Sequence, residues 1–172
     1  RDLVRSRGLG DVYRRQHIDM VDLAMCEEDV RTVIKHPTSM IGSDGEALAP
    51  YGVLGEIKTH PRAYGTYPRI LGKYVRDEKV LTLEDAIRKM TSLPAQKLGL
   101  TDRGLVREGM WADIVVFNPM RVGDKATYDD PRRYPEGINY VLVNGEVVVD
   151  KGEHTGALPG KVLLPTNRDQ QI

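Results

Sequence analysis

Two short segments of the chain carry side chains whose types and spacing suit hydrolytic chemistry. The first, Gly42-Ser43-Asp44-Gly45, places a carboxylate between two glycines, which allow close approach of a ligand or another backbone. Such a carboxylate can take up a proton during a reaction and return it later. A tight Asp-Gly turn accounts for the same residues, and on the pattern alone this turn is the favoured interpretation.

The second segment spans residues 60–66, with the sequence His-Pro-Arg-Ala-Tyr-Gly-Thr, and its cation is Arg62. A guanidinium group is planar, and its fork of N–H donors matches the two oxygens of a carboxylate. Arg62 is therefore a candidate for binding a substrate carboxylate, and an ordinary surface arginine is the alternative. Ser43 and His60 are neighbours of these candidates and have no assigned role.

The histidines and the single cysteine do not predict a metal centre within this chain. His17, His36, His60 and His154 form no close pair of the kind that binds zinc. Cys26 has no histidine beside it in the sequence, so we expect a structural or surface residue and not a nucleophile.

The candidate carboxylate needs an element that delivers it, and the sequence predicts a buried strand over residues 39–45. In parallel α/β proteins, sites are built at the carboxyl ends of strands, and Asp44 lies at that end of this segment. Residues 27–36 carry an apolar face of helical spacing, and Pro37 ends the predicted helix. A further short strand is expected within residues 18–25.

After Asp44, glycine and proline recur through residues 46–79, which predicts a long loop around Arg62. Helices are predicted from Thr82, which suits an N-cap, and from Ser92 as far as Gly99. Beyond residue 100, strands are predicted over residues 112–117, 140–143 and 146–149, and Asn144-Gly145 favours a hairpin turn. The chain is thus expected to be α/β to about residue 100 and antiparallel β to about residue 165.

Composition excludes several classes of partner. The 172 residues include 25 basic and 25 acidic side chains, and this balance argues against nucleic acid or an anionic membrane as a partner. No apolar run approaches the roughly 20 residues that span a bilayer, and the first residues lack a signal-peptide pattern. A single cysteine is consistent with a reducing compartment, so a cytoplasmic protein is expected.

Taken together and in this order, the segments resemble the N-acyl-D-amino-acid deacylases, or D-aminoacylases, of the amidohydrolase superfamily. The resemblance runs from about Glu27 to Gly160. Met-Thr-Ser-Leu-Pro-Ala at residues 90–95 and Gly-Met-Trp-Ala-Asp-Ile-Val at residues 109–115 are shared by many amidohydrolases. The Gly-Ser-Asp-Gly segment together with residues 60–66 indicates the deacylase branch.

The resemblance implies zinc-dependent hydrolysis of N-acyl-D-amino acids to a D-amino acid and a carboxylate. It implies an α/β fold, with the end of a (β/α)8 barrel over residues 1–100 and strands of a small β-sandwich with a tail over residues 101–172. A barrel alone needs roughly 250 residues. The chain is therefore expected to be the C-terminal part of the enzyme, partnered by the N-terminal portion, which would carry most zinc ligands.

Within that resemblance, Asp44 is expected to act as general base toward a zinc-bound water, then as proton donor to the leaving amine, with a possible contact to the metal. Arg62 is expected to bind the α-carboxylate of the small-molecule substrate. The stretch between Asp44 and His60 is longer than the resemblance leads one to expect, so the acyl and side-chain preference is not assigned.

Two alternatives stay open at this point. One is another metal-dependent amidohydrolase, related to the cyclic amidases or dihydroorotases, in which Asp44 keeps its role and Arg62 does not. The other is a non-catalytic chain, either an inactive fragment or a subunit that completes its site beside another polypeptide.

Overall fold

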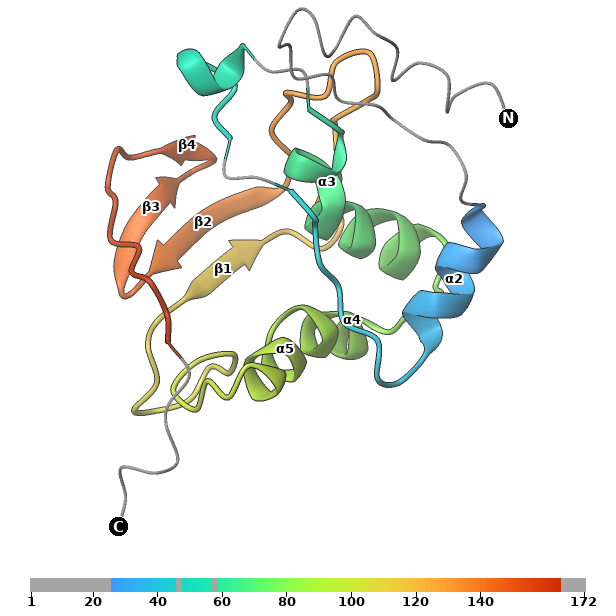
Figure 1. Ribbon diagram of the computed structural model, residues 1–172, viewed down its shortest axis with the longest axis horizontal. Helices are drawn as coiled ribbons and strands as arrows, with labels where there is room; N and C mark the ends of the chain where they lie inside the picture. Colours follow the sequence, from blue (N-terminus) through green and yellow to red (C-terminus); the bar gives the residue numbers. More distant parts are fainter. Residues whose placement is uncertain (1–25, 46–47, 57–58, 165–172) are drawn as a thin grey trace, which may run out of the picture.

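The computed structural model describes residues 26–45, 48–56 and 59–164 of the chain. The strand expected within residues 18–25 lies outside these residues. Apart from the short helix at residues 53–55, the described chain places its helices on one side and a small sheet on the other (Figure 1). Its helices are α2 (Glu27–Lys35), η2 (Val53–Gly55), α3 (Arg62–Arg69), η3 (Ile70–Asp77), α4 (Leu83–Met90) and α5 (Ser92–Lys97). Its strands are β1 (Ile114–Phe117), β2 (Ile138–Val143), β3 (Glu146–Asp150) and β4 (Glu153–His154).

The helix predicted over residues 27–36 is confirmed as α2. Three acidic residues occupy its first turn and Lys35 its last, which suits the helix dipole. His36 has extended backbone angles ahead of Pro37, as expected of a residue that precedes proline. Ile34 is the buried residue of this helix and joins the core.

The long loop predicted over residues 46–79 is wrong for its second half, which forms α3 and the π-helix η3. Gly65, Pro68 and Gly72 are residue types typical of loops, but their spacing of three and four places them on one helical face, and all three are buried. A Cβ on Gly72 would lie 2.8 Å from the carbonyl oxygen of Val122. These glycines therefore serve close packing of the helix and not a turn.

The buried strand predicted over residues 39–45 is also wrong for this chain. The segment is irregular, and Met40, Gly42 and Asp44 are exposed. A strand needs a neighbouring strand to accept and donate its backbone hydrogen bonds, and within the described residues none lies beside it. The Ile41 N–H donates instead to the carbonyl oxygen of Lys89 on α4.

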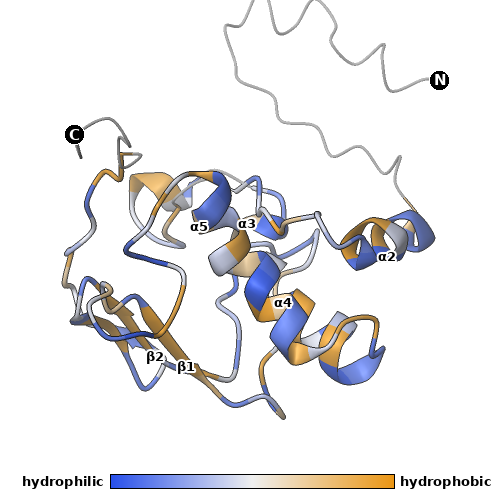
Figure 2. Ribbon diagram, turned by 90° about the horizontal axis from the view of Figure 1, so that it is seen from below, coloured by the Kyte–Doolittle hydropathy of each residue, from blue (hydrophilic) through white to orange (hydrophobic). Residues whose placement is uncertain are grey.

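The predicted helices after Thr82 and Ser92 are confirmed as α4 and α5. The Thr82 side chain accepts a hydrogen bond from the N–H of Asp85 and so caps α4. Gly99 has a φ of 73° just after α5, as expected for the residue that ends a helix. Figure 2 shows apolar and polar residues alternating along α4, which buries Ala86 completely.

Beyond residue 100, the three predicted antiparallel strands are confirmed as β1, β2 and β3, and β4, which was not predicted, adds a fourth strand in the order β1-β2-β3-β4. Asn144 and Gly145 join β2 to β3 with φ values of 51° and 86°, the geometry that a type I′ turn requires. The described residues thus form one sheet and a set of helices that share a core. Buried residues of that core are Ile34, Ile70, Leu71, Tyr74, Leu81, Ala86 and Val122.

No helix among the described residues is both long enough and apolar enough to cross a membrane.

Candidate active site

Asp44 lies in an irregular segment at the surface, between α2 and α3. Its φ is 48°, and its side chain is 84% exposed. The hydroxyl of Ser43 accepts a hydrogen bond from the Gly45 N–H at 3.2 Å. A Cβ on Gly45 would lie 2.8 Å from the Cα of Ala63 in α3, so glycine is required where the segment meets that helix. The backbone at Asp44 is left-handed without a regular turn, and the segment presents the Asp44 side chain to solvent.

Arg62 is the first residue of α3, and the structure brings it to Asp44. A guanidinium nitrogen, Nη2, lies 2.7 Å from Oδ2 of Asp44. The Nε–H of Arg62 also donates to the backbone carbonyl of Asp44 at 3.1 Å. Two residues that are 18 positions apart in the sequence thus form one polar site, in which a guanidinium group and a carboxylate make an ion pair at the surface.

His60 supports the start of α3. Its Nδ1 accepts a hydrogen bond from the backbone N–H of Arg62 at 3.0 Å, which satisfies one of the free donors of the first helical turn. Its ring meets the edge of Tyr128 at 5.2 Å. Burial lowers the pKa of His60 below its usual value, and the charge of Arg62 lowers it further while Asp44 opposes them. The neutral ring is the form whose Nδ1 can accept this bond.

A group of tyrosines lies near the start of α3, and sequence analysis did not identify it. Tyr64 lies two residues after Arg62, and its ring meets that of Tyr134 at 6.0 Å. Within the described residues its buried hydroxyl has no hydrogen-bond partner, and burial raises its pKa. Arg132 donates to the carbonyl oxygen of Gly55, which ties the residues after Asp44 to those before β2. A sequence signal for this group was present in residues 128–134, a polar segment with a tyrosine at each end that lies between β1 and β2.

The described residues do not form a metal centre by themselves. No three of their His, Cys, Asp and Glu side chains come together as a possible ligand set. Cys26 is exposed, as the surface interpretation predicted, and its thiol donates to Asp29 at 3.1 Å. Asp44 offers a single exposed carboxylate, which suits a proton carrier or one ligand of a centre completed by other residues.

Comparisons with known proteins agree with the sequence resemblance. Residues 7–149 match the model of the Amidohydrolase family. The N-acyl-D-aspartate deacylase of Alcaligenes xylosoxydans xylosoxydans is 45% identical over 168 residues, which cover 95% of this chain and 32% of that enzyme. The D-aminoacylase of the same organism is 42% identical over 142 residues, covering 83% of this chain and 28% of the enzyme.

A solved structure shows the same similarity in three dimensions. The N-acyl-D-glutamate deacylase of Bordetella bronchiseptica, complexed with zinc and a phosphonate inhibitor that mimics the tetrahedral intermediate, superposes with a TM-score of 0.65 at 41% identity. The match covers 76% of this chain and 27% of that protein. The chain therefore spans about a third of the length of the relatives that it matches. Because the family model matches most of its residues, the chain belongs to the amidohydrolase family, and its relatives there include N-acyl-D-amino-acid deacylases.

Proposed function

We propose that this chain is the C-terminal part of a zinc-dependent enzyme that hydrolyses the amide bond of N-acyl-D-amino acids. The observation that carries the proposal is the 2.7 Å pairing of Asp44 with Arg62 in a chain of this family. In an N-acyl-amino acid, the amide nitrogen and the carboxyl carbon are attached to the same Cα. A proton donor for that nitrogen and a binding group for that carboxylate must therefore be neighbours.

In this proposal, Arg62 holds the substrate by its α-carboxylate. Asp44 engages two of the five N–H groups of the guanidinium, so others remain to meet a second carboxylate. The Arg62 side chain is 47% exposed, so a small molecule can reach it. His60 fixes the first turn of α3, from which Arg62 projects.

Asp44 would move the proton. Bound zinc supplies a water whose pKa is lowered toward neutrality. Asp44 accepts the proton of the attacking water and then donates it to the amide nitrogen as the C–N bond breaks, so that the products are a D-amino acid and a carboxylate. The exposure of Asp44 in the described chain leaves its carboxylate available for this role.

The rest of the site would come from the N-terminal portion of the same enzyme. Residues 1–100 would complete a (β/α)8 barrel with that portion, and residues 101–172 would add strands to a β-sandwich. The proposal is supported by the coverage of the relatives, which extend well beyond this chain. Most zinc ligands would then lie outside the described residues, which hold no ligand set of their own.

The test is turnover of N-acyl-D-amino acids by the complete zinc-loaded enzyme, with Asp44→Asn as the variant. Asparagine keeps the shape of the side chain but cannot accept the proton, so kcat should fall by at least ~10², with KM little changed. The control is Asp129→Asn, which alters another exposed carboxylate and should leave kcat unchanged. If Asp44→Asn kept most of the wild-type kcat, Asp44 would be a turn residue only and the proposal would fail.

A further inference from the structure

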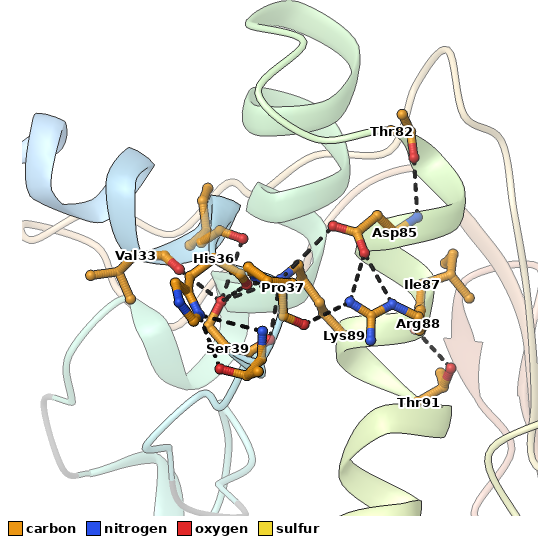
Figure 3. Close-up of polar contacts among 12 residues, drawn as sticks. Val33, His36, Pro37, Ser39, Thr82, Asp85, Ile87, Arg88, Lys89 and Thr91 are labelled. Atoms are coloured by element: carbon orange, nitrogen blue, oxygen red, sulfur yellow. Dashed lines mark hydrogen bonds and ion pairs between the residues drawn. The ribbon is translucent and has the colours of Figure 1, made fainter.

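Lys89 is the only polar or charged residue among the described residues that is buried, and its side chain is 0% exposed. It lies in the last turn of α4, and Figure 3 shows its side chain directed at the end of α2. A buried ammonium is costly unless acceptors surround it. Its position therefore calls for an explanation beyond packing.

The ammonium group of Lys89 binds the turn that follows α2. Its Nζ donates to the carbonyl oxygen of His36, and it lies 3.3 Å from both the carbonyl oxygen and the hydroxyl of Ser39. The Ser39 hydroxyl in turn lies 2.7 Å from the carbonyl oxygen of Val33. Carbonyl groups at the end of a helix carry partial negative charge and lack partners within the helix. Lys89 supplies the charge and the donors that they need.

The backbone of Lys89 holds the same segment a second time. Its carbonyl oxygen accepts the hydrogen bond of the Ile41 N–H at 3.1 Å. One residue thus fixes the chain at Ser39 and again at Ile41, three residues before Asp44. On the far side of Asp44, Gly45 packs against Ala63, and Arg62 binds the carboxylate. The segment that carries Asp44 is therefore held on both sides, by Lys89 before Asp44 and by α3 after it.

We propose that Lys89 is a positioning residue for the reaction, which sets where the Asp44 carboxylate lies relative to the carboxylate-binding Arg62. The proposal rests on the proposed function of Asp44 and adds a residue that touches neither substrate nor the reacting atoms. Displacement of a catalytic group by about 1 Å can cost up to ~10² in rate. Loss of the Lys89 ammonium should therefore be felt in kcat, although its nitrogen is remote from the substrate.

The experiment compares Lys89→Met and Arg88→Met in the complete zinc-loaded enzyme, with activity expressed per zinc-loaded, folded site. Lys89→Met keeps the length of the side chain and removes its donors, and it should lower kcat by about 10- to 100-fold. KM should change less than about 2-fold, because Arg62 stands on α3 and makes no contact with Lys89. Arg88 is the matched control: it donates to the carbonyl oxygen of Pro37 in the same turn but is partly exposed.

A double variant separates positioning from general support. In an Asp44→Asn background, Lys89→Met should cause little further loss, because a residue that acts through Asp44 has nothing left to position. Equal losses of kcat in Lys89→Met and Arg88→Met, or full additivity with Asp44→Asn, would overturn the proposal. So would a wild-type kcat in Lys89→Met accompanied only by a lower melting temperature.

If the Lys89→Met variant does not fold, two other measurements on a Ser39→Ala variant test the same proposal. Ser39→Ala removes one acceptor of the ammonium and should lower kcat in the same direction, with KM unchanged. Hydrogen exchange of the amides in residues 39–45 should also become faster than in wild type, while α3 keeps its protection. Unchanged exchange and unchanged kcat in Ser39→Ala would overturn the proposal. A failure of the proposed function is seen separately, as a wild-type kcat in Asp44→Asn alone.

Discussion

Asp44 and Arg62 lie 2.7 Å apart, yet the segments that carry them are held in place in opposite ways. Arg62 begins a helix that continues into η3, and together they bury Gly65, Pro68, Ile70, Leu71, Gly72 and Tyr74. Asp44 stands on an irregular segment whose flanking residues are largely exposed. The Asp44 segment is fixed by a few contacts, to Lys89 before it and to α3 after it.

The difference reflects how each type of backbone satisfies its hydrogen bonds. A helix pairs most of its own N–H and C=O groups, so α3 and η3 form from local sequence plus one buried face. A strand pairs with other strands, and those must come from elsewhere in the molecule. The Asp44 segment, which has no neighbouring strand among the described residues, therefore stays irregular, whereas the Arg62 segment forms a helix from its own residues. The following predictions test this contrast.

The largest expected effect is complete loss of function in the 172-residue chain by itself. Its described residues hold no ligand set for a metal, and a carboxylate alone does not generate hydroxide at neutral pH. We therefore expect no release of D-amino acid from N-acyl-D-amino acids, even with added zinc. Turnover by the purified chain with stoichiometric zinc would show that it contains a whole active site.

The next largest effect is the loss of kcat/KM when Arg62, which begins α3, is replaced. A charge-assisted hydrogen bond is worth roughly 1.5–3 kcal/mol, so Arg62→Ala in the complete enzyme should lower kcat/KM by about 10- to 100-fold, mainly through KM. Arg62→Lys keeps the charge but loses the fork, so it should also be impaired. Steady-state kinetics on an N-acyl-D-amino acid measure both.

The control for Arg62 is a substrate whose carboxylate has been converted to an amide. The wild-type enzyme should discriminate strongly against this amide, and Arg62→Ala should treat acid and amide nearly alike. If the variant preferred the acid by the wild-type ratio, Arg62 would be a surface arginine. In that case the assignment to linear N-acyl-amino acids would lose its main structural support.

Local signals explain which parts of this fold the sequence predicts. The cap of α4 depends on Thr82 and on an N–H three residues away, and the hairpin depends on Asn144-Gly145. Each signal lies within a few residues of the element that it specifies. Those elements are accordingly confirmed with bounds close to the predicted ones, as is α2.

Signals that depend on distant residues were missed or misassigned. Gly65 and Gly72 look like loop residues until Asp124 and Val122 are known to pack against them. The strand predicted before Asp44 has no neighbouring strand among the described residues. At the site, residue type and spacing pointed to Asp44 and Arg62 and the resemblance supplied their roles, but the contribution of Lys89 depends on a contact with a turn 50 residues earlier in the sequence. No sequence pattern in this chain predicts that contact.

A smaller effect is expected on stability, when Gly72 in η3 and Gly42 in the Asp44 segment are each replaced by alanine. In Gly72→Ala the new Cβ would lie 2.8 Å from a backbone oxygen that cannot easily move. The overpacking should outweigh the gain in helix propensity, for a net loss of about 1–2 kcal/mol in the free energy of unfolding. In Gly42→Ala the Cβ would enter open space, so the change should stay within about 0.5 kcal/mol. Urea unfolding of the two variants gives the comparison, and equal losses would contradict it.

The smallest effect is the pH dependence of the contact that fastens α2 to η3. Glu27 lies 2.7 Å from Lys73, accepts a hydrogen bond from the Tyr74 hydroxyl at 2.9 Å and lies 3.4 Å from Arg69. The hydrogen bond from Lys73 contributes most to lowering the pKa of Glu27 from 4.5 to about 2, with help from Tyr74 and Arg69 and against the effect of burial. The ionised carboxylate is therefore favoured in the folded chain.

A carboxyl group whose pKa is lower in the folded state stabilises that state above its unfolded pKa. The contribution should be complete above about pH 4.5 and should disappear as the pH falls toward 2. Glu27 is nearly half exposed, so solvent screening limits the effect to about 1 kcal/mol. Glu27→Gln should lower the free energy of unfolding by that amount at pH 6, with a difference from wild type that shrinks below pH 4.

Glu28→Gln is the matched control, because it removes a charge from the same helical turn at a residue without an ion pair among the described residues. A constant difference between Glu27→Gln and wild type from pH 6 to pH 3, or an equal effect of Glu28→Gln, would show that the contact with η3 does not fasten α2.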